Sequence, residues 1–348
     1  MYFAILWKNP EISLAELELV KPTIAKTINN QIVVFETQYP EKLDTLWWII
    51  KRGETVNRDE LKSKLLETKL IWVSNGNFWL QLKRNYGIRR YKTVDIFHTD
   101  LEIKKKWLEV IDIQNLTWIV KWYQNINLYE VVDFDKPARS MQMWMMPAKL
   151  TLIMINLWLQ QLSTDWEANI YDPFAWSMTT WFIANFMWHS FIGSDIEWKY
   201  ADENLDRRKH NKFYNSDKNI DFFQHDINNN LTLDKFKQWI PNLIVTEWRL
   251  WPIVRRNEGS IALKNIQEET YNLYETFIRQ IYKFYKTNTN IIPTMVFTIP
   301  IYREDNIIEE NIKKLCNELN FRKLDSVDEI YKRAEQNIWR KILVLKQN

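Results

Sequence analysis

Asp172, Asp195 and Asp226 each follow an apolar run that is typical of a short buried strand. In a doubly wound sheet the carboxyl ends of parallel strands meet at one edge, and ligands bind in the crevice there. Asp195 has the place of an acid that accepts hydrogen bonds from both hydroxyls of a ribose. Asp226, at the third strand end, can accept from an adenine amino group. These residues predict a site for an adenosyl ligand. The alternative is that Asp195 and Asp226 only cap strand-to-helix loops.

The segment 172–181 has the sequence Asp-Pro-Phe-Ala-Trp-Ser-Met-Thr-Thr-Trp and lies between a predicted strand and a predicted helix. In such turns glycines let the backbone approach a ligand, and the first amides of the helix face it. Trp176, Met178 and Trp181 occupy positions where glycine is expected. The residues predicted to bind the cofactor lie in this loop or end the neighbouring strands: Asp172, Pro173, Phe174, Ala175, Trp176, Ser177, Thr179, Thr180, Trp181, Asp195 and Asp226.

Glycine is scarce and tryptophan is abundant, with 5 and 19 residues among 348. Average proteins contain roughly 7% glycine, and the two types together amount to about that share here. Trp47-Trp48, Trp188, Trp248 and Trp251 lie in turn-like contexts that call for a positive φ. We hypothesise that the source translates UGA as glycine and that many of these tryptophans are glycines in the natural protein. A genuinely tryptophan-rich protein is the alternative, and UGG codons at these positions would establish it.

Strands and helices are predicted to alternate from about residue 131 onward. An apolar helix over 150–159 precedes the first strand, a long helix over 262–286 follows the fourth, and a strand over 340–346 closes the chain. Such alternation indicates a parallel, doubly wound α/β sheet, and the closing strands indicate an antiparallel hairpin at one edge. The change of pattern divides the chain into residues 1–130 and 131–348.

Residues 1–130 are predicted to form a mixed α+β module that opens with a strand over 2–6 and a helix capped by Ser13. A basic stretch over 83–106 can follow a phosphate backbone, although a solvated helix face fits the same charges. Its basic residues are Lys83, Arg84, Arg89, Arg90, Lys92, Lys104, Lys105 and Lys106.

Composition excludes several classes of protein. The formal net charge is +3 and the apolar share is 46%, which predicts a soluble globular chain. A single cysteine, Cys316, excludes an internal disulfide framework and favours a reducing compartment, so a cytoplasmic location is expected. The apolar stretch 141–158 is broken by Pro147 and Lys149 and is too short to span a bilayer, so no membrane partner is expected. The four histidines lack metal-ligand spacing.

The loop over 172–181 resembles the first motif of methyltransferases that modify exocyclic amines of nucleobases, Asp-Pro-Phe-x-Gly-x-Gly-Thr. Residues 136–140 and 145–150 resemble the stretch before that motif in bacterial relatives of the THUMP-containing tRNA guanine-N2 methyltransferases. Residues 55–130 match that family poorly. Further stretches that resemble it are 5–16, 47–51 and 334–342. The resemblance implies a Rossmann-like seven-stranded domain that binds S-adenosyl-L-methionine, an N-terminal THUMP-like RNA-binding module, and RNA, in particular tRNA, as the partner.

The resemblance also implies a second motif, Asp/Asn-Pro-Pro-Tyr, after the fourth strand, where Thr246, Glu247, Arg249 and Pro252 stand. Glu247 then has the role of the acid, which accepts a hydrogen bond from the target amine and orients its lone pair toward the sulfonium methyl. A carboxylate also favours the positive charge that develops on that nitrogen. The aromatic position is missing, and Arg249 is expected to stack on a base or pair with phosphate.

The function expected from these residues is methyl transfer to an exocyclic amine of a nucleobase, with tRNA guanine-N2 as the target. Alignment of nitrogen, methyl carbon and sulfur would provide most of the acceleration. Arg139 and Lys149 are expected to contact substrate phosphate or to form structural salt bridges. Two alternatives stay open, a DNA adenine-N6 methyltransferase and a non-catalytic RNA-binding protein on a decayed methyltransferase fold. Met178 and the atypical fourth-strand motif favour the second.

Overall fold

The chain divides into two compact units, Met1–Asn125 and Ile126–Asn348. The computed structural model describes residues 1–348 except 8, 68–70, 74–83, 85–90, 94–107, 114–115, 125, 137, 139–144, 160–166, 198, 207–219, 237–238, 248–258, 290, 303–306, 325–329 and 332–337.

The N-terminal unit is built on one eight-stranded sheet in the order β2-β3-β1-β4-β8-β7-β5-β6. Its pairs are antiparallel, apart from β5, which pairs in parallel with β6 and β7. An α+β module with a largely antiparallel sheet is therefore present. Its strands are β1 (Tyr2–Leu6), β2 (Thr23–Ile28), β3 (Ile32–Glu36), β4 (Ile49–Thr55), β5 (Ile71–Val73), β6 (Tyr91–Thr93), β7 (Leu108–Ile113) and β8 (Leu116–Tyr123), and its helices include α1 (Pro10–Leu17) and α2 (Arg58–Glu67).

Helix α1 is anchored to the turn that precedes β4. It begins after Asn9, so the prediction that Ser13 caps the helix is wrong. Ser13 is instead buried in the helix, where its hydroxyl donates to the carbonyl of Trp48 at 2.7 Å. The buried carboxylate of Glu16 accepts from the backbone N–H groups of Trp47 at 2.9 Å and Trp48 at 2.5 Å. The turn needs these polar partners because its backbone groups are shielded from water.

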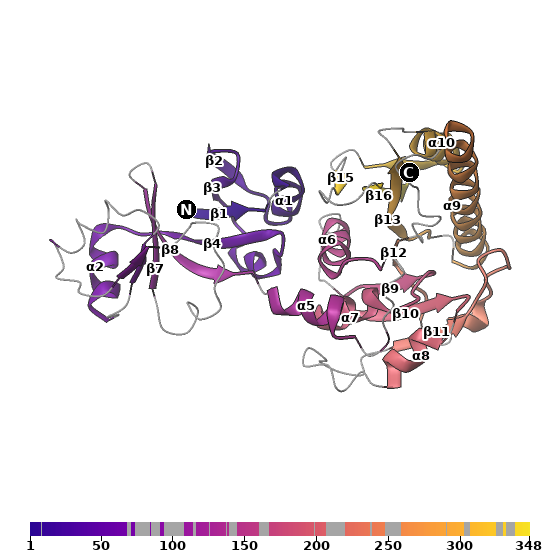
Figure 1. The fold of residues 1–348 in the computed structure, drawn as a ribbon, viewed down its shortest axis with the longest axis horizontal. Coiled ribbons are helices and arrows are strands. Elements are labelled where there is room, and N and C mark those ends of the chain that lie inside the picture. The colour runs from indigo at the N-terminus through magenta and orange to yellow at the C-terminus, as the bar shows by residue number, and fades with distance from the viewer. Residues whose placement is uncertain are drawn as a thin grey trace. The chain divides into compact units, whose positions relative to one another are not determined.

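The C-terminal unit alternates strands and helices (Figure 1). Its strands are β9 (Asn169–Asp172), β10 (Ser190–Asp195), β11 (Ile220–Gln224), β12 (Leu243–Glu247), β13 (Thr294–Tyr302), β14 (Phe321–Lys323), β15 (Ile330–Tyr331) and β16 (Ile338–Gln347). Its helices include α5 (Ile126–Phe134), α6 (Ala148–Leu159), α7 (Thr179–Phe186), α8 (Lys199–Asp206), α9 (Ser260–Asn288) and α10 (Ile307–Glu318).

The sheet of this unit follows the path β11-β10-β9-β12-β13-β16-β14, with β15 paired to β16 beside it. The first five strands are parallel, and β16 runs antiparallel to both β13 and β14. The predicted Rossmann-like seven-stranded sheet with an antiparallel closing strand is confirmed. The direction of winding reverses between β9 and β12, which makes the crevice at their carboxyl ends the expected place for a ligand.

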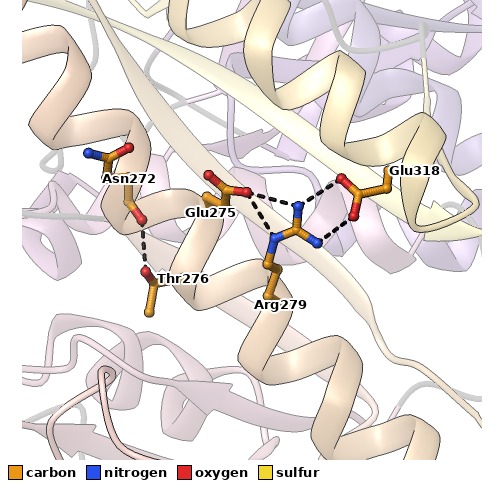
Figure 2. Close-up of polar contacts among 5 residues, drawn as sticks. All are labelled: Asn272, Glu275, Thr276, Arg279 and Glu318. Carbon is orange, nitrogen blue, oxygen red and sulfur yellow. Dashed lines mark hydrogen bonds and ion pairs between the residues drawn. The ribbon is translucent and has the colours of Figure 1, made fainter.

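Helices α9 and α10 cover one face of this sheet, and α6 and α7 lie against the other (Figure 1). The long helix α9 buries Phe277, Ile281 and Tyr285, which recur at the helical period predicted from the sequence. Arg279 joins α9 to α10, because its guanidinium binds both carboxylate oxygens of Glu318 at 2.7 Å (Figure 2). Among the described residues, no helix has the length and apolarity to cross a membrane.

Candidate functional site

The loop between β9 and α7 has the backbone of a glycine turn. Trp176 has a φ of 24° and Met178, which precedes the first residue of α7, has a φ of 58°. The amide of Ala175 donates to the carbonyl of Ser194 at 2.9 Å, which holds the loop against the end of β10. Gly193 permits this approach, because a Cβ there would lie 3.0 Å from the Cβ of Ala175. The loop therefore has positive φ at two positions where the motif has glycine, although the chain has larger residues there.

Asp172 ties this loop to the neighbouring strand β12. Its carboxylate is 2% exposed and accepts from the amide of Phe174 at 3.0 Å. It also accepts from the hydroxyl of Thr180 in α7 at 2.5 Å and from that of Thr246 in β12 at 2.6 Å. Burial raises the pKa of Asp172 to about 7, since its partners are neutral donors. Asp172 and Thr246 thus hold loop, helix and strand together.

Asp195 and Asp226 both bond to their own loops. Asp195 accepts from the amide of Trp176 at 3.0 Å and from that of Glu197 at 2.9 Å, and burial raises its pKa. Asp226 is half-buried, and its Oδ1 accepts from the backbone amide and the side-chain amide of Asn228. These bonds are the ones expected if Asp195 and Asp226 only cap their strand-to-helix loops. A carboxylate has about four lone-pair sites, so each residue keeps further acceptor capacity.

Glu247, the last residue of β12, lies in a buried ion pair with Arg340 of β16. The Nε of Arg340 is 2.5 Å from Oε1 of Glu247, and its Nη2 is 3.4 Å from Oε2. Thr298 of β13 donates its hydroxyl to the same Oε1 at 3.0 Å. Arg340 is 1% exposed and Glu247 is 8% exposed. Three adjacent strands therefore fix the orientation of this carboxylate, and Oε1 is the more heavily used of its two oxygens.

Lys136 and Asn204 were not among the predicted site residues, yet both bind the loop. Lys136 is 5% exposed, and its Nζ lies 3.1 Å from the hydroxyl of Ser177 and 2.6 Å from that of Thr179. Asn204, fully buried in α8, donates to the carbonyls of Ser177 and Ala138 and accepts from the amide of Ala138. Lys136 opens the stretch that resembles the methyltransferase family, which was the available signal. Asn204 had no signal, because only the fold brings α8 to the loop.

The other predicted residues take several places. Phe174 packs edge-on against Phe277 of α9, and the carbonyl of Pro173 accepts from the hydroxyl of Ser194 at 3.4 Å. Trp181 is 1% exposed within α7. The Lys149 ammonium lies 5.9 Å from the centre of a tyrosine ring in α5. Arg139, Arg249 and Pro252 lie outside the described residues, as does the basic stretch over 83–106 apart from residues 84 and 91–93.

Two of the tryptophans show features that are unusual for this residue type. The indole N–H groups of Trp176 and Trp118 are buried and find no acceptor among the described residues. A buried indole usually finds one. The ring of Trp176 lies 4.8 Å from that of Tyr200 in α8, and its backbone amide donates to the carboxylate of Asp195. A glycine at this position would keep the backbone bond and remove the indole from the site.

Comparison with known proteins gives likeness to solved structures only. No model of a known family and no curated protein matches the chain. SMU.472, a candidate methyltransferase complexed with SAH, is 10% identical and covers 100% of this chain and 98% of its own, with a TM-score of 0.45. The rRNA methyltransferase aviRa from Streptomyces viridochromogenes is 12% identical, with coverages of 64% and 94% and a TM-score of 0.40. The METTL16 methyltransferase domain is 11% identical, with coverages of 63% and 91% and a TM-score of 0.44.

Proposed function

We propose that the C-terminal unit binds S-adenosylmethionine and transfers its methyl group to an exocyclic amine of a nucleobase in RNA, with tRNA guanine-N2 as the target. One observation carries this proposal. Asp172, Asp195 and Glu247 end three neighbouring parallel strands at the point where the winding of the sheet reverses. A loop with two left-handed residues lies at the same edge. This arrangement is suited to a nucleoside cofactor next to an acceptor for an amine.

The residues at this edge fit the cofactor through backbone and carboxylates. Asp195 would accept from the ribose hydroxyls and Asp226 from the adenine amine, each through oxygen lone pairs that its own loop leaves over. The positive φ values at Trp176 and Met178 let the loop backbone face the ligand. Asp172 and Thr180 hydrogen-bond to each other and hold the loop in place, so we assign them no direct contact with the ligand. When bound, the cofactor supplies an electrophilic methyl group on its sulfonium.

The residues of β12 would handle the amine. Glu247 accepts a hydrogen bond from the target nitrogen and stabilises its developing positive charge, while Arg340 and Thr298 hold the carboxylate in place. The hydroxyl of Thr246 is committed to Asp172, so we assign it to positioning the strand. The roles of Arg249 and Pro252 in holding the base follow from the resemblance alone.

The RNA assignment rests on the N-terminal module, predicted over 1–130, and on the family resemblance. RNA-modifying enzymes recognise shape and backbone and take the target base out of its stack. We propose this module as the part that binds RNA, and Arg139 and Lys149 as contacts to substrate phosphate. We also propose the basic stretch over 83–106 of the N-terminal module as a contact to the RNA backbone.

The experiment is incubation of the purified protein, with glycine at Trp176, Trp181 and Trp188, with cofactor labelled on its methyl group. Total RNA and total DNA serve as separate substrates, and digestion to nucleosides identifies the methylated atom. Label in N2-methylguanosine would support the proposal. Label in N6-methyladenine of DNA would contradict it and favour a DNA adenine-N6 methyltransferase. The Glu247→Gln variant is the control, since it should bind cofactor and transfer on the order of 100-fold less label.

A non-catalytic RNA-binding protein is a second candidate, and the ion pair of Glu247 with Arg340 favours it. A carboxylate that already has a buried cationic partner has less capacity for a substrate amine. This candidate predicts RNA binding without label transfer. Absence of cofactor binding to the protein with glycine at 176, 181 and 188 would favour it further.

A further inference from the structure

A buried cation lies at the loop of the proposed cofactor site. The Nζ of Lys136 donates to hydroxyls on both sides of Met178, those of Ser177 and Thr179. Lysine is almost never this deeply buried unless its charge serves an interaction. The position is specific, since it brings a positive charge to the first turn of α7, the turn that follows the loop.

The hydroxyls that Lys136 contacts can pass hydrogen bonds onward. Each hydroxyl oxygen that accepts from Nζ keeps its own hydrogen for another acceptor. The first amides of α7 are further donors, because a helix leaves its leading N–H groups without partners inside the helix. The ammonium, the two hydroxyls and the leading amides are therefore donors at the start of α7. The helix dipole stabilises an anion near a helix N-terminus, and a lysine ammonium beside it adds to that attraction.

Asn204 fixes this arrangement. Its side-chain amide joins the carbonyls of Ala138 and Ser177, at 3.2 and 3.1 Å, so the segment that carries Lys136 and the loop are held at a constant distance. A preorganised cation binds an anionic group without the cost of ordering a long flexible side chain.

We infer that the ammonium of Lys136 receives the carboxylate at the amino-acid end of S-adenosylmethionine, with Ser177 and Thr179 as supporting donors. This inference rests on the proposed function, because it assigns one end of the proposed cofactor. Asp195 and Asp226 would then hold the ribose and adenine. The proposed site has a cation, Lys136, at one end and the carboxylates of Asp195 and Asp226 at the other. This difference would give the elongated ligand one orientation.

The test compares two ligands that differ in that carboxylate. S-adenosylhomocysteine carries the amino-acid end, and 5′-methylthioadenosine lacks it while keeping the adenosine and the sulfur. Calorimetry measures the affinity of the full chain for each ligand, in the protein with glycine at 176, 181 and 188 and in the same protein with Lys136→Met. A charge-assisted hydrogen bond accounts for a loss on the order of 10- to 100-fold in the affinity for S-adenosylhomocysteine. The affinity for 5′-methylthioadenosine should stay within about twofold by the same reasoning.

The outcomes separate a ligand contact from a structural role. An equal loss for both ligands would mean that Lys136 only shapes the loop, and it would overturn the inference, as would no loss for either. Failure of the glycine-bearing protein with Lys136 intact to bind either ligand would overturn the proposed function itself. Lys314→Met removes an exposed lysine of α10 and controls for net charge, so it should change neither affinity. If Lys136→Met does not fold, Lys136→Gln keeps a polar head for both hydroxyls and gives the same comparison.

Discussion

Trp188 ends helix α7 in a conformation that glycine normally supplies, and this gives a sharp test of the recoding hypothesis. Its φ is 63°, its amide donates to the carbonyl of Asn185 at 3.1 Å, and the next amide, of His189, donates to the carbonyl of Ala184 at 2.9 Å. This pair of bonds defines the Schellman motif, whose left-handed residue is usually glycine. Trp188 is 59% exposed, so its side chain contributes little burial.

The expected effect follows from comparing glycine with alanine at this position. A left-handed conformation costs roughly 1–2 kcal/mol for a residue with a Cβ. Glycine loses about 0.5–1 kcal/mol more conformational entropy on folding than alanine. Trp188→Gly should therefore be more stable than Trp188→Ala by about 1 kcal/mol. With a denaturant slope of about 2–3 kcal/mol per molar urea, the midpoints should differ by about 0.3–0.5 M.

The assay is urea unfolding of the full chain, followed by far-UV circular dichroism. Both variants lack the indole, so its loss cancels in the comparison. Exposed Glu268 in the middle of α9 is the matched control, because glycine in a helix interior is less stable than alanine by about 1 kcal/mol. The glycine variant should therefore be the more stable of the two at position 188 and the less stable of the two at position 268. Alanine as stable as glycine at 188, with the normal order at 268, would refute the reasoning.

Other predictions concern the site. Because burial raises the pKa of Asp172 to about 7 from 3.8, its folded state binds the extra proton, so its contribution to stability is full below about pH 4 and is lost as the pH rises through 7. Asp172→Asn should lack this fall, which is at most about 4 kcal/mol, in urea titrations at several pH values. Glu247→Gln should lower transfer on the order of 100-fold and leave cofactor affinity unchanged, and the added substitution Arg340→Met should recover stability in urea titrations without recovering transfer in the label assay. Met178→Gly should destabilise by about 1–3 kcal/mol in the same urea titration, because the cavity left by a fully buried methionine costs more than the relieved strain; a stabilised variant would contradict this.

Much of the C-terminal fold was predictable from the sequence because its strands are buried on both faces. The strands over 169–172 and 243–247 bury apolar residues at 170–171 and 243–245, and both end in polar residues at the carboxyl edge. The long helix α9 was predicted from apolar residues at helical spacing, because one face of the helix is buried along its length. The alternation of elements predicted a parallel, doubly wound sheet but not the order of its strands.

The contacts between distant residues could not be predicted in this way. Glu247 and Arg340 are separated by 93 positions, and only the insertion of β16 beside β13 brings them together. Neither residue has a local pattern that marks a buried ion pair. In the N-terminal unit, Ser13 resembles a helix cap locally, and its bond to Trp48 depends on a turn 35 positions away. Secondary-structure propensity depends on residues nearby in the sequence, whereas the partners of these side chains are set by the tertiary fold.

Asp172 and Glu247 end adjacent strands in opposite electrostatic surroundings, and the contrast bears on catalysis. Asp172 meets only neutral donors, and burial raises its pKa to about 7. Glu247 instead lies in a buried ion pair with the guanidinium of Arg340. The two acids therefore differ in what they hold. The bonds of Asp172 to Phe174, Thr180 and Thr246 fix the loop, whereas the carboxylate of Glu247, oriented by Arg340 and Thr298, is the one that would meet the proposed amine.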